Sequence, residues 1–143
     1  MRNVRRAAVT GAAVLGLSLF AGNAEATPGS GVEAVTLAGT TVDGRDYVLR
    51  EITVQPGGGT GWHFHDGTLY AYVRQGNLSH FDASCASDGE YAAGATFVEP
   101  SGADHVHIGR NLGDRPLVLD VLYVLPAGSP LSEDAPNPGC PFE

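Results

Sequence analysis

The histidines of this sequence have a regular spacing, since four of the five lie in two pairs of the form His-x-His. His63 and His65 make the first pair, and His105 and His107 make the second. Side chains two residues apart in a β-strand project from the same face, so each pair could hold a cation between its ring nitrogens. One pair is weak evidence, but two pairs that each follow a Gly- or Pro-containing turn favour a shared metal site. His80 stands alone and is interpreted as an ordinary structural residue.

The elements that must position these histidines are strands. From Thr27 onward no stretch keeps a 3.6-residue apolar period, whereas short runs rich in β-branched and aromatic residues recur between turn residues. The expected strands are Val32–Leu37, Tyr47–Val54, Thr68–Val73, Leu78–Phe81, Thr96–Val98, His105–Ile108 and Leu117–Leu125. The last of these is almost continuously apolar, so we expect it to be the most deeply buried. Short strands at this spacing predict an all-β sandwich or barrel.

The composition agrees with a loop-rich β domain and disfavours two kinds of partner. The chain has 143 residues, enough for one domain, and contains 20 Gly and 9 Pro. Its 8 basic residues, all arginine, face 16 acidic ones and give a net charge of −8. A chain with this negative charge repels the phosphate backbone of nucleic acids, and we therefore expect no nucleic-acid partner. After the N-terminal segment no stretch is apolar enough to cross a membrane, and we expect no stable membrane anchor.

Residues 1–26 have the pattern of a secretory signal peptide. Three arginines in the first six residues precede the apolar run Ala7–Ala21, and Ala24-Glu25-Ala26 supplies a small-x-small cleavage pattern. Cleavage near Ala26 would leave residues 27–143 as a single secreted or periplasmic domain. The arginine pair before the apolar run leaves two routes open, the general secretory route and the twin-arginine route.

The two cysteines, Cys85 and Cys140, are expected to form a disulfide, because an exported chain enters an oxidising compartment. Neither lies in a Cys-x-x-Cys motif or beside a histidine, which disfavours a thiolate metal site. The bridge would fix the Pro-rich C-terminal tail, residues 126–143, to the body of the domain. In the chain-entropy model it would stabilise the fold by on the order of 4 kcal/mol at most.

The surroundings of the first histidine pair resemble the first motif of the cupin superfamily, G-x5-H-x-H-x3,4-E-x6-G. Gly57, His63, His65 and Gly76 stand at the spacings of that motif. The sequence departs from it at one ligand position, where Leu69 replaces the acidic residue. The resemblance therefore implies a neutral site in which no Asp or Glu reaches the metal.

The second cupin motif, G-x5-P-x-G-x2-H-x3-N, is also present, although its two halves disagree about the last ligand. Counting forward through Gly94–Gly102 places this ligand at His105, whereas counting back from Asn111 places it at His107. We favour His107, because Leu112–Pro116 then resembles the usual turn into the next strand. His105 remains the alternative third ligand.

The resemblance covers about Gly57–Tyr123 and implies a small, single-domain, type-2-like cupin, a jelly-roll β-barrel with a metal in its mouth. The implied ligands of one divalent ion, Fe, Mn, Zn, Cu or Ni, are His63, His65 and His107. Three neutral imidazoles leave positions open for water, O2 or an anion, which favours Lewis-acid or oxygen chemistry. Cupins with three-histidine sites include thiol dioxygenases.

The implied function is that of an exported metal-binding cupin that carries out metal-dependent small-molecule chemistry, with oxygenase-type oxidation first. A dioxygenase or a lyase would fit, and no catalytic residue is assigned. The alternative is a non-catalytic cupin that uses the same pocket to bind a small ligand. Pocket candidates are Leu69, Tyr70 and Trp62, although strict alternation directs Tyr70 outward and Trp62 is expected to pack at the barrel rim. The expected partner is a small molecule, and a homodimer is left open.

Overall fold

The described chain folds as antiparallel β-structure. The computed structural model describes residues 28–143. Its strands are β1 (Ser30–Val42), β2 (Arg45–Gly59), β3 (His63–Phe64), β4 (Thr68–Gln75), β5 (Asn77–Asp82), β6 (Ser87–Ala92), β7 (Thr96–Glu99), β8 (His107–Arg110), β9 (Leu117–Pro126) and β10 (Glu133–Asp134). Within this range there is no helix of the length and apolar character that a membrane span requires. The predicted signal peptide, residues 1–26, lies outside the described residues.

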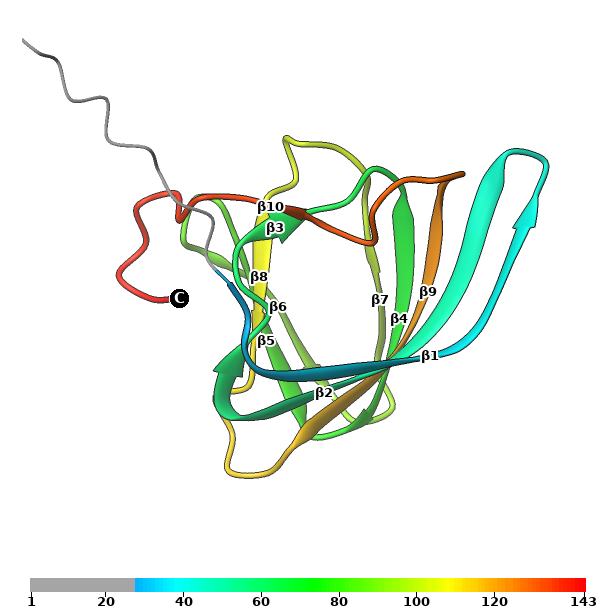
Figure 1. The fold of residues 1–143 in the computed structure, drawn as a ribbon. Coiled ribbons are helices and arrows are strands. Elements are labelled where there is room, and N and C mark those ends of the chain that lie inside the picture. Colours follow the sequence, from blue (N-terminus) through cyan, green and yellow to red (C-terminus); the bar gives the residue numbers. More distant parts are fainter. Residues whose placement is uncertain (1–27) are drawn as a thin grey trace, which may run out of the picture.

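The strands wrap into a nearly closed barrel with two walls (Figure 1). One wall has the order β2-β9-β4-β7, with β1 paired to β2 on the side away from β9. The other wall contains β3, β8, β5 and β6, and β10 extends it beyond β3. The pair Gly59 and Arg110 connects β2 to β8 and so joins the walls. The all-β jelly-roll barrel predicted from the sequence is confirmed.

Strand β9 supplies the centre of the core, because it is paired on both sides, by β2 and by β4. Its buried positions alternate with half-buried ones and are Leu117, Leu119, Val121, Tyr123 and Leu125. This alternation directs one face into the barrel, where it packs against Leu69, Ala71 and Val73 of β4. The continuous apolar run Leu117–Leu125 in the sequence therefore forms a central strand of the sheet.

The strand boundaries around the second histidine pair differ from the prediction. We expected a strand over His105–Ile108, but β8 begins at His107. His105 lies in a turn, where its backbone N–H donates to the carbonyl of Gly102 at 3.0 Å. Strands β6 and β10 were not predicted at all, because both are polar and acquire strand geometry from the pairing with β5 and β3.

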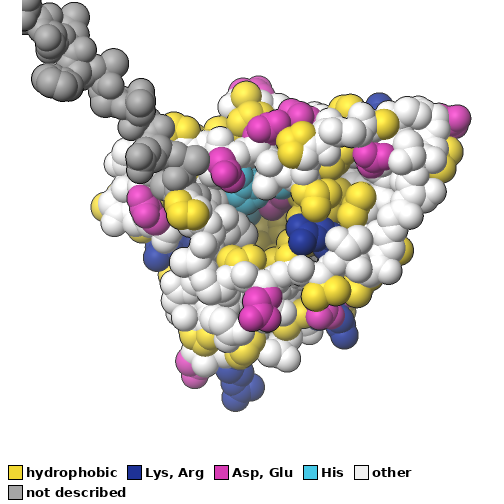
Figure 2. Space-filling view, viewed as in Figure 1, with side chains coloured by type: hydrophobic (Ala, Val, Ile, Leu, Met, Phe, Trp, Pro, Cys, Tyr) yellow, Lys and Arg dark blue, Asp and Glu magenta, His cyan; other side chains and the backbone are white. Residues whose placement is uncertain are grey.

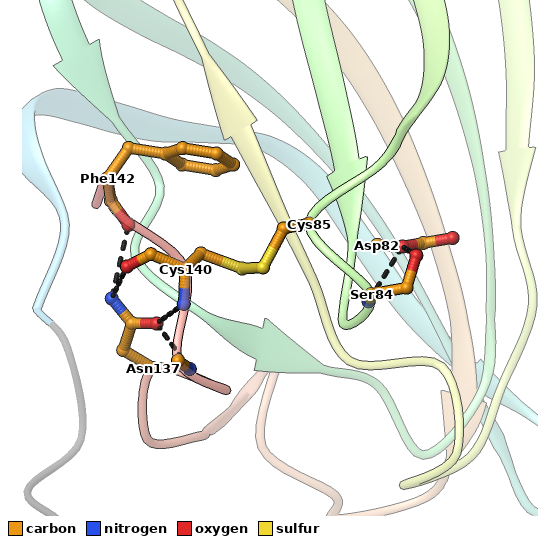
Figure 3. Close-up of a disulfide and its surroundings, with 7 residues drawn as sticks. Asp82, Ser84, Cys85, Asn137, Cys140 and Phe142 are labelled. Carbon is orange, nitrogen blue, oxygen red and sulfur yellow. Dashed lines mark hydrogen bonds between the residues drawn. A yellow bond between two sulfur atoms is a disulfide. The ribbon is translucent and has the colours of Figure 1, made fainter.

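The C-terminal tail is held against the second wall by the predicted disulfide, which is confirmed (Figure 3). The Cα atoms of Cys85 and Cys140 are 5.5 Å apart. Asn137 ties the end of the tail together, since its side-chain oxygen accepts from the N–H of Cys140 at 2.7 Å and its amide donates to the carbonyl of Phe142 at 3.1 Å. Cys140 also packs with Trp62 in a second small core outside the barrel interior.

Candidate metal centre

Three histidines and one glutamate converge inside the barrel. His63 and His107 are cross-strand partners on β3 and β8, and His65 follows β3 directly. Glu99 enters from the opposite wall, at the end of β7. One ligand atom from each of the four side chains lies within 4.8 Å of the others. That separation is close to the span that one cation bridges at ligand distances of about 2.0–2.2 Å.

Backbone carbonyls fix the orientation of all three imidazoles. The Nδ1 atoms of His63, His65 and His107 lie 2.8, 2.7 and 2.7 Å from the carbonyl oxygens of Gly61, Leu131 and His105. A carbonyl oxygen can only accept, so each Nδ1 carries the proton and donates it. Each Nε2 of the neutral ring then presents a lone pair to the centre. Carbonyl partners of this kind orient the histidine ligands of metal sites.

The local backbone explains why His63 points inward. Gly61 has a φ of +77°, a conformation that side chains other than glycine rarely adopt. The turn at Gly61 directs its carbonyl toward the ring of His63. The neighbouring Thr60 contributes a second polar contact, with its hydroxyl 3.4 Å from the same ring nitrogen. The Gly-rich segment before β3 therefore positions both His63 and the Gly61 carbonyl, which sets the tautomer of the His63 ring.

Glu99 closes the cluster from the side opposite the three histidines. Its Oε2 lies 3.2 Å from Nε2 of His65 and 3.4 Å from Nε2 of His107. Both nitrogens are buried, and neither makes a hydrogen bond of good geometry within the described chain. Buried polar atoms without such partners are costly. A divalent cation would satisfy the nitrogen lone pairs and the carboxylate at once, so these residues fit a metal.

Burial and neighbouring charges together set the protonation states of His63 and Glu99. Burial, together with repulsion from the neighbouring imidazoles, lowers the pKa of His63 to about 3, although Glu99 works against the shift. Burial would raise the pKa of the Glu99 carboxyl, but contacts with the surrounding histidines outweigh it and hold that pKa well below its usual range. At neutral pH His63 is therefore neutral and Glu99 is ionised, the states in which both bind metal.

His80 supports Glu99 from behind. Its Nε2 lies 3.4 Å from Oε1 of Glu99, and its Nδ1 lies 2.5 Å from Oδ1 of Asp88. Burial lowers the pKa of His80, but hydrogen bonding and attraction to the two carboxylates outweigh this and raise it. We interpreted His80 from the sequence as an ordinary structural residue. In the structure it orients the one acidic residue of the cluster.

The expectation of a neutral site without a carboxylate is wrong, because Glu99 belongs to the cluster. Leu69 is buried and lines the cavity, and the acid lies directly across the ladder from it. One signal for Glu99 was present in the sequence. It lies two residues after Phe97, on the face of β7 that points into the barrel.

The other predicted site residues lie apart from the cluster. The side chain of His105 is 45% exposed and contacts Asp104, so only its backbone carbonyl serves the site. Tyr70 is 51% exposed and lies on the outer face of β4. Trp62 is fully buried, but it packs in the second core against the tail and not in the cavity. Of the three pocket candidates, only Leu69 lines the cavity.

A cavity of about 180 Å³ extends from the cluster into the barrel. Figure 2 shows its opening, with histidine atoms on one side and basic and hydrophobic side chains on the other. Apolar residues form much of its wall and include Val32, Ile52, Leu78, Phe97 and Leu119. The polar side chains beside the cluster are those of Arg50, Thr60, Tyr123 and Ser132. A site of this kind accepts a small molecule next to the cluster and excludes bulk water from its walls.

Tyr123 brings a phenol close to the cluster, with its ring centroid 5.9 Å from that of His65. Burial raises the pKa of Tyr123 to about 12, although the guanidinium of Arg50 acts in the opposite direction. The phenol is therefore protonated at neutral pH. It can donate a hydrogen bond to a ligand but is a poor base.

Comparison with known proteins agrees with this geometry. The family model described as the cupin domain matches residues 50–125, more than half of the chain. This range includes all four side chains of the cluster. No curated protein matches the sequence.

Several solved structures share the fold at low sequence identity. A conserved protein with a double-stranded β-helix domain from Klebsiella pneumoniae is 20% identical, with a TM-score of 0.58 over 73% of this chain and 84% of that chain. The polyketide cyclase RemF from Streptomyces resistomycificus is 22% identical, with a TM-score of 0.57 over 85% of this chain and 83% of that chain. A cupin-2 domain protein from Rhodospirillum rubrum is 19% identical, with a TM-score of 0.59 over 74% of this chain and 66% of that chain.

Proposed function

Since the chain belongs to the cupin domain family, we propose that it binds one divalent transition-metal ion and uses it for chemistry on a small molecule in the barrel cavity. The ligands in this proposal are the Nε2 atoms of His63, His65 and His107 and the carboxylate of Glu99. Oxygen-dependent oxidation is the reaction class that we place first.

One observation carries the proposal. Three imidazoles have their Nδ1 protons committed to backbone carbonyls, so three Nε2 lone pairs meet an ionised carboxylate in a buried space. When the rings are neutral, their Nε2 lone pairs and the Glu99 carboxylate are all acceptors, and a cation between them would satisfy them together. The arrangement is typical of a metal site whose outer contacts hold the ligands ready.

Imidazole and carboxylate donors suit Fe, Mn, Cu, Ni and Zn, and a bound redox-active ion would supply oxidation by O2. The residues of the chain have other tasks. Glu99 offsets part of the charge of a divalent ion, and His80 holds Glu99 in place. The apolar walls keep water from the reacting atoms, and Tyr123 offers a hydrogen-bond donor to a substrate.

Export to an extracytoplasmic compartment is part of the proposal. The disulfide Cys85–Cys140 supports it, because such bridges persist where the surroundings are oxidising. The signal-peptide pattern of residues 1–26 also supports it, although this segment lies outside the described residues.

Elemental analysis of protein purified without chelators tests the metal proposal. We expect close to one divalent transition-metal ion per chain. His107→Ala should remove it, whereas the matched variant His105→Ala should keep it, because the side chain of His105 is exposed. If only His105→Ala lost the metal, the assignment of the third ligand would be wrong. If both variants kept it, the cluster would not be the metal site.

The reaction class is tested separately, with protein loaded with Fe(II). Oxygen uptake that depends on an added small molecule and is absent from His107→Ala would support the oxygenase. Tight retention of a small molecule with no turnover would instead support a binding cupin.

A further inference from the structure

Arg50 brings a positive charge into the barrel cavity. Of the arginines in residues 28–143, it alone lines the cavity beside the metal cluster. It lies on β2, and its cross-strand partner on β9 is Val121, a buried residue of the same cavity. Partners directly opposite each other in an antiparallel ladder project from the same face. Ile52, two residues after Arg50, lines the cavity as well, so this face of β2 points inward.

No carboxylate of the described chain neutralises this charge. Residues 28–143 contain no ion pair that includes Arg50, and its Nε is buried without a hydrogen bond. Arg74 behaves differently, because it lies on the outer face of β4 and pairs with Glu51 and Asp120. A partly buried cation with an unused donor costs free energy unless a partner neutralises it. The guanidinium does contact the hydroxyl of Tyr123, but that phenol is neutral. An anionic partner of Arg50 would therefore come from outside the chain.

We propose that Arg50 binds the carboxylate of a small organic acid whose body lies in the cavity beside the metal cluster. The planar guanidinium matches a carboxylate and can hold both of its oxygens. Tyr123, which lines the same cavity, offers its hydroxyl as a second donor. The inference rests on the proposed function, because the reacting part of this acid would lie at the metal centre.

The size and charge of the cavity favour a small monoanion. Its volume of about 180 Å³ lies below the roughly 300–1,000 Å³ that is usual for drug-sized ligands. A divalent ion and Arg50 together exceed the single negative charge of Glu99, so the loaded cavity is positive within a protein of net charge −8. A phosphate of charge about −1.5 to −2 would need more donors than one guanidinium and one hydroxyl. A carboxylate on an apolar body fits both the donors and the walls.

Isothermal titration calorimetry with simple probes tests the inference. Benzoate and isovalerate are compared with benzamide, isovaleramide and inorganic phosphate, on the metal-loaded and on the metal-free protein. The variants are Arg50→Gln, Arg50→Lys and, as a matched control, Arg74→Gln on the outer face of the barrel. We expect a carboxylate to bind the wild type at least about tenfold more tightly than its amide. Arg50→Gln should lose that preference, Arg50→Lys should keep part of it, and Arg74→Gln should behave as the wild type.

Two controls keep the result decisive. Circular dichroism and metal content of each variant establish that the fold and the cluster are intact, and if Arg50→Gln does not fold, Arg50→Lys decides the question. Equal binding of acid and amide, tighter binding of phosphate, or unchanged carboxylate binding in the folded Arg50 variant would each overturn the inference. A protein without metal would contradict the proposed function instead, while the titrations of the metal-free protein would still decide the role of Arg50.

Discussion

Leu69 of β4 and Glu99 of β7 stand directly opposite each other in the antiparallel ladder. The cupin motif has an acidic residue at the position of Leu69. In this chain the acidic residue is Glu99, on the neighbouring strand β7. Because cross-strand partners share a face, a carboxylate at either position is directed toward the same space. The metal cluster therefore keeps an acidic member even though its motif position is apolar.

Glu99→Gln should weaken metal binding by more than about tenfold, since it removes the anionic ligand and leaves the shape nearly unchanged. Competition with a chelator measures the affinity. Glu33→Gln is the matched control, because Glu33 is an exposed residue of β1. An affinity equal to that of the wild type would show that Glu99 is not a ligand.

The exchange of the two partners, Leu69→Glu with Glu99→Leu, should restore much of the metal binding that Glu99→Leu alone loses. The reason is that both side chains lie opposite each other on one face of the ladder. Metal content of the single and double variants, compared at equal protein concentration, measures the rescue. A double variant that folds but holds no more metal than Glu99→Leu would contradict the geometric equivalence.

The stability of the metal-free protein should fall as the pH decreases from about 6 to about 4, by up to about 1.4 kcal/mol per pH unit. The pKa of His63 is lowered to about 3 in the fold, whereas a histidine of the unfolded chain titrates near about 6.5. Between these values the unfolded state binds a proton that the folded state does not, so stability rises with pH there. Urea denaturation at a series of pH values measures this slope.

The other shifted groups of the cluster do not reverse that slope. The lowered pKa of Glu99 acts in the same direction, because its contribution is lost only as the pH falls below the ordinary carboxyl range. The raised pKa of His80 gives a stabilisation that is complete below about 6.5 and is lost as the pH rises above it. His63→Gln should therefore flatten the acid slope, and His105→Gln should leave it unchanged. A slope that persists in His63→Gln would assign it to another group.

Removal of the disulfide by Cys85→Ser and Cys140→Ser should lower the free energy of unfolding by up to about 4 kcal/mol, since it frees a long loop in the unfolded chain. It should also weaken metal binding, because the tail that Cys140 anchors carries the Leu131 carbonyl that orients His65. Denaturation and chelator competition measure the two effects on the same samples. Lower stability with unchanged metal affinity would show that the tail stays in place without the bridge.

The sequence sufficed for those parts of the structure that depend on local pattern. Alternation and turn residues predict most of the strands, and the two cysteines with an export signal predict the bridge. The His-x-His spacing locates three of the four side chains of the cluster. The choice of His107 over His105 as a ligand stays a prediction, although the structure brings only the first of them to the cluster.

What the sequence did not reveal depends on pairing between distant segments. Glu99 is an acid at the end of a short strand, and its spacing of two residues from Phe97 is the one local signal that it faces inward; its place beside the histidines follows only when β7 pairs with β4. The contact of His80 with Glu99 joins two strands that are not neighbours in the sheet. The carbonyl of Leu131 that orients His65 lies 66 residues away along the chain. Interactions of this kind arise from the register of the barrel and have no periodic signal.

The position of the C-terminal tail, residues 126–143, affects the order in which the parts of the candidate metal site are synthesised. His63, His65, Glu99 and His107 are all translated before the segment that carries Leu131 and Cys140. The support of His65 is thus translated last, and the disulfide between Cys85 and Cys140 adds a covalent attachment to the pairing of β10 with β3. Under the proposed function, a chain whose bridge has not yet formed should hold its metal less tightly than the oxidised chain, so thiol oxidation and metal retention would be coupled.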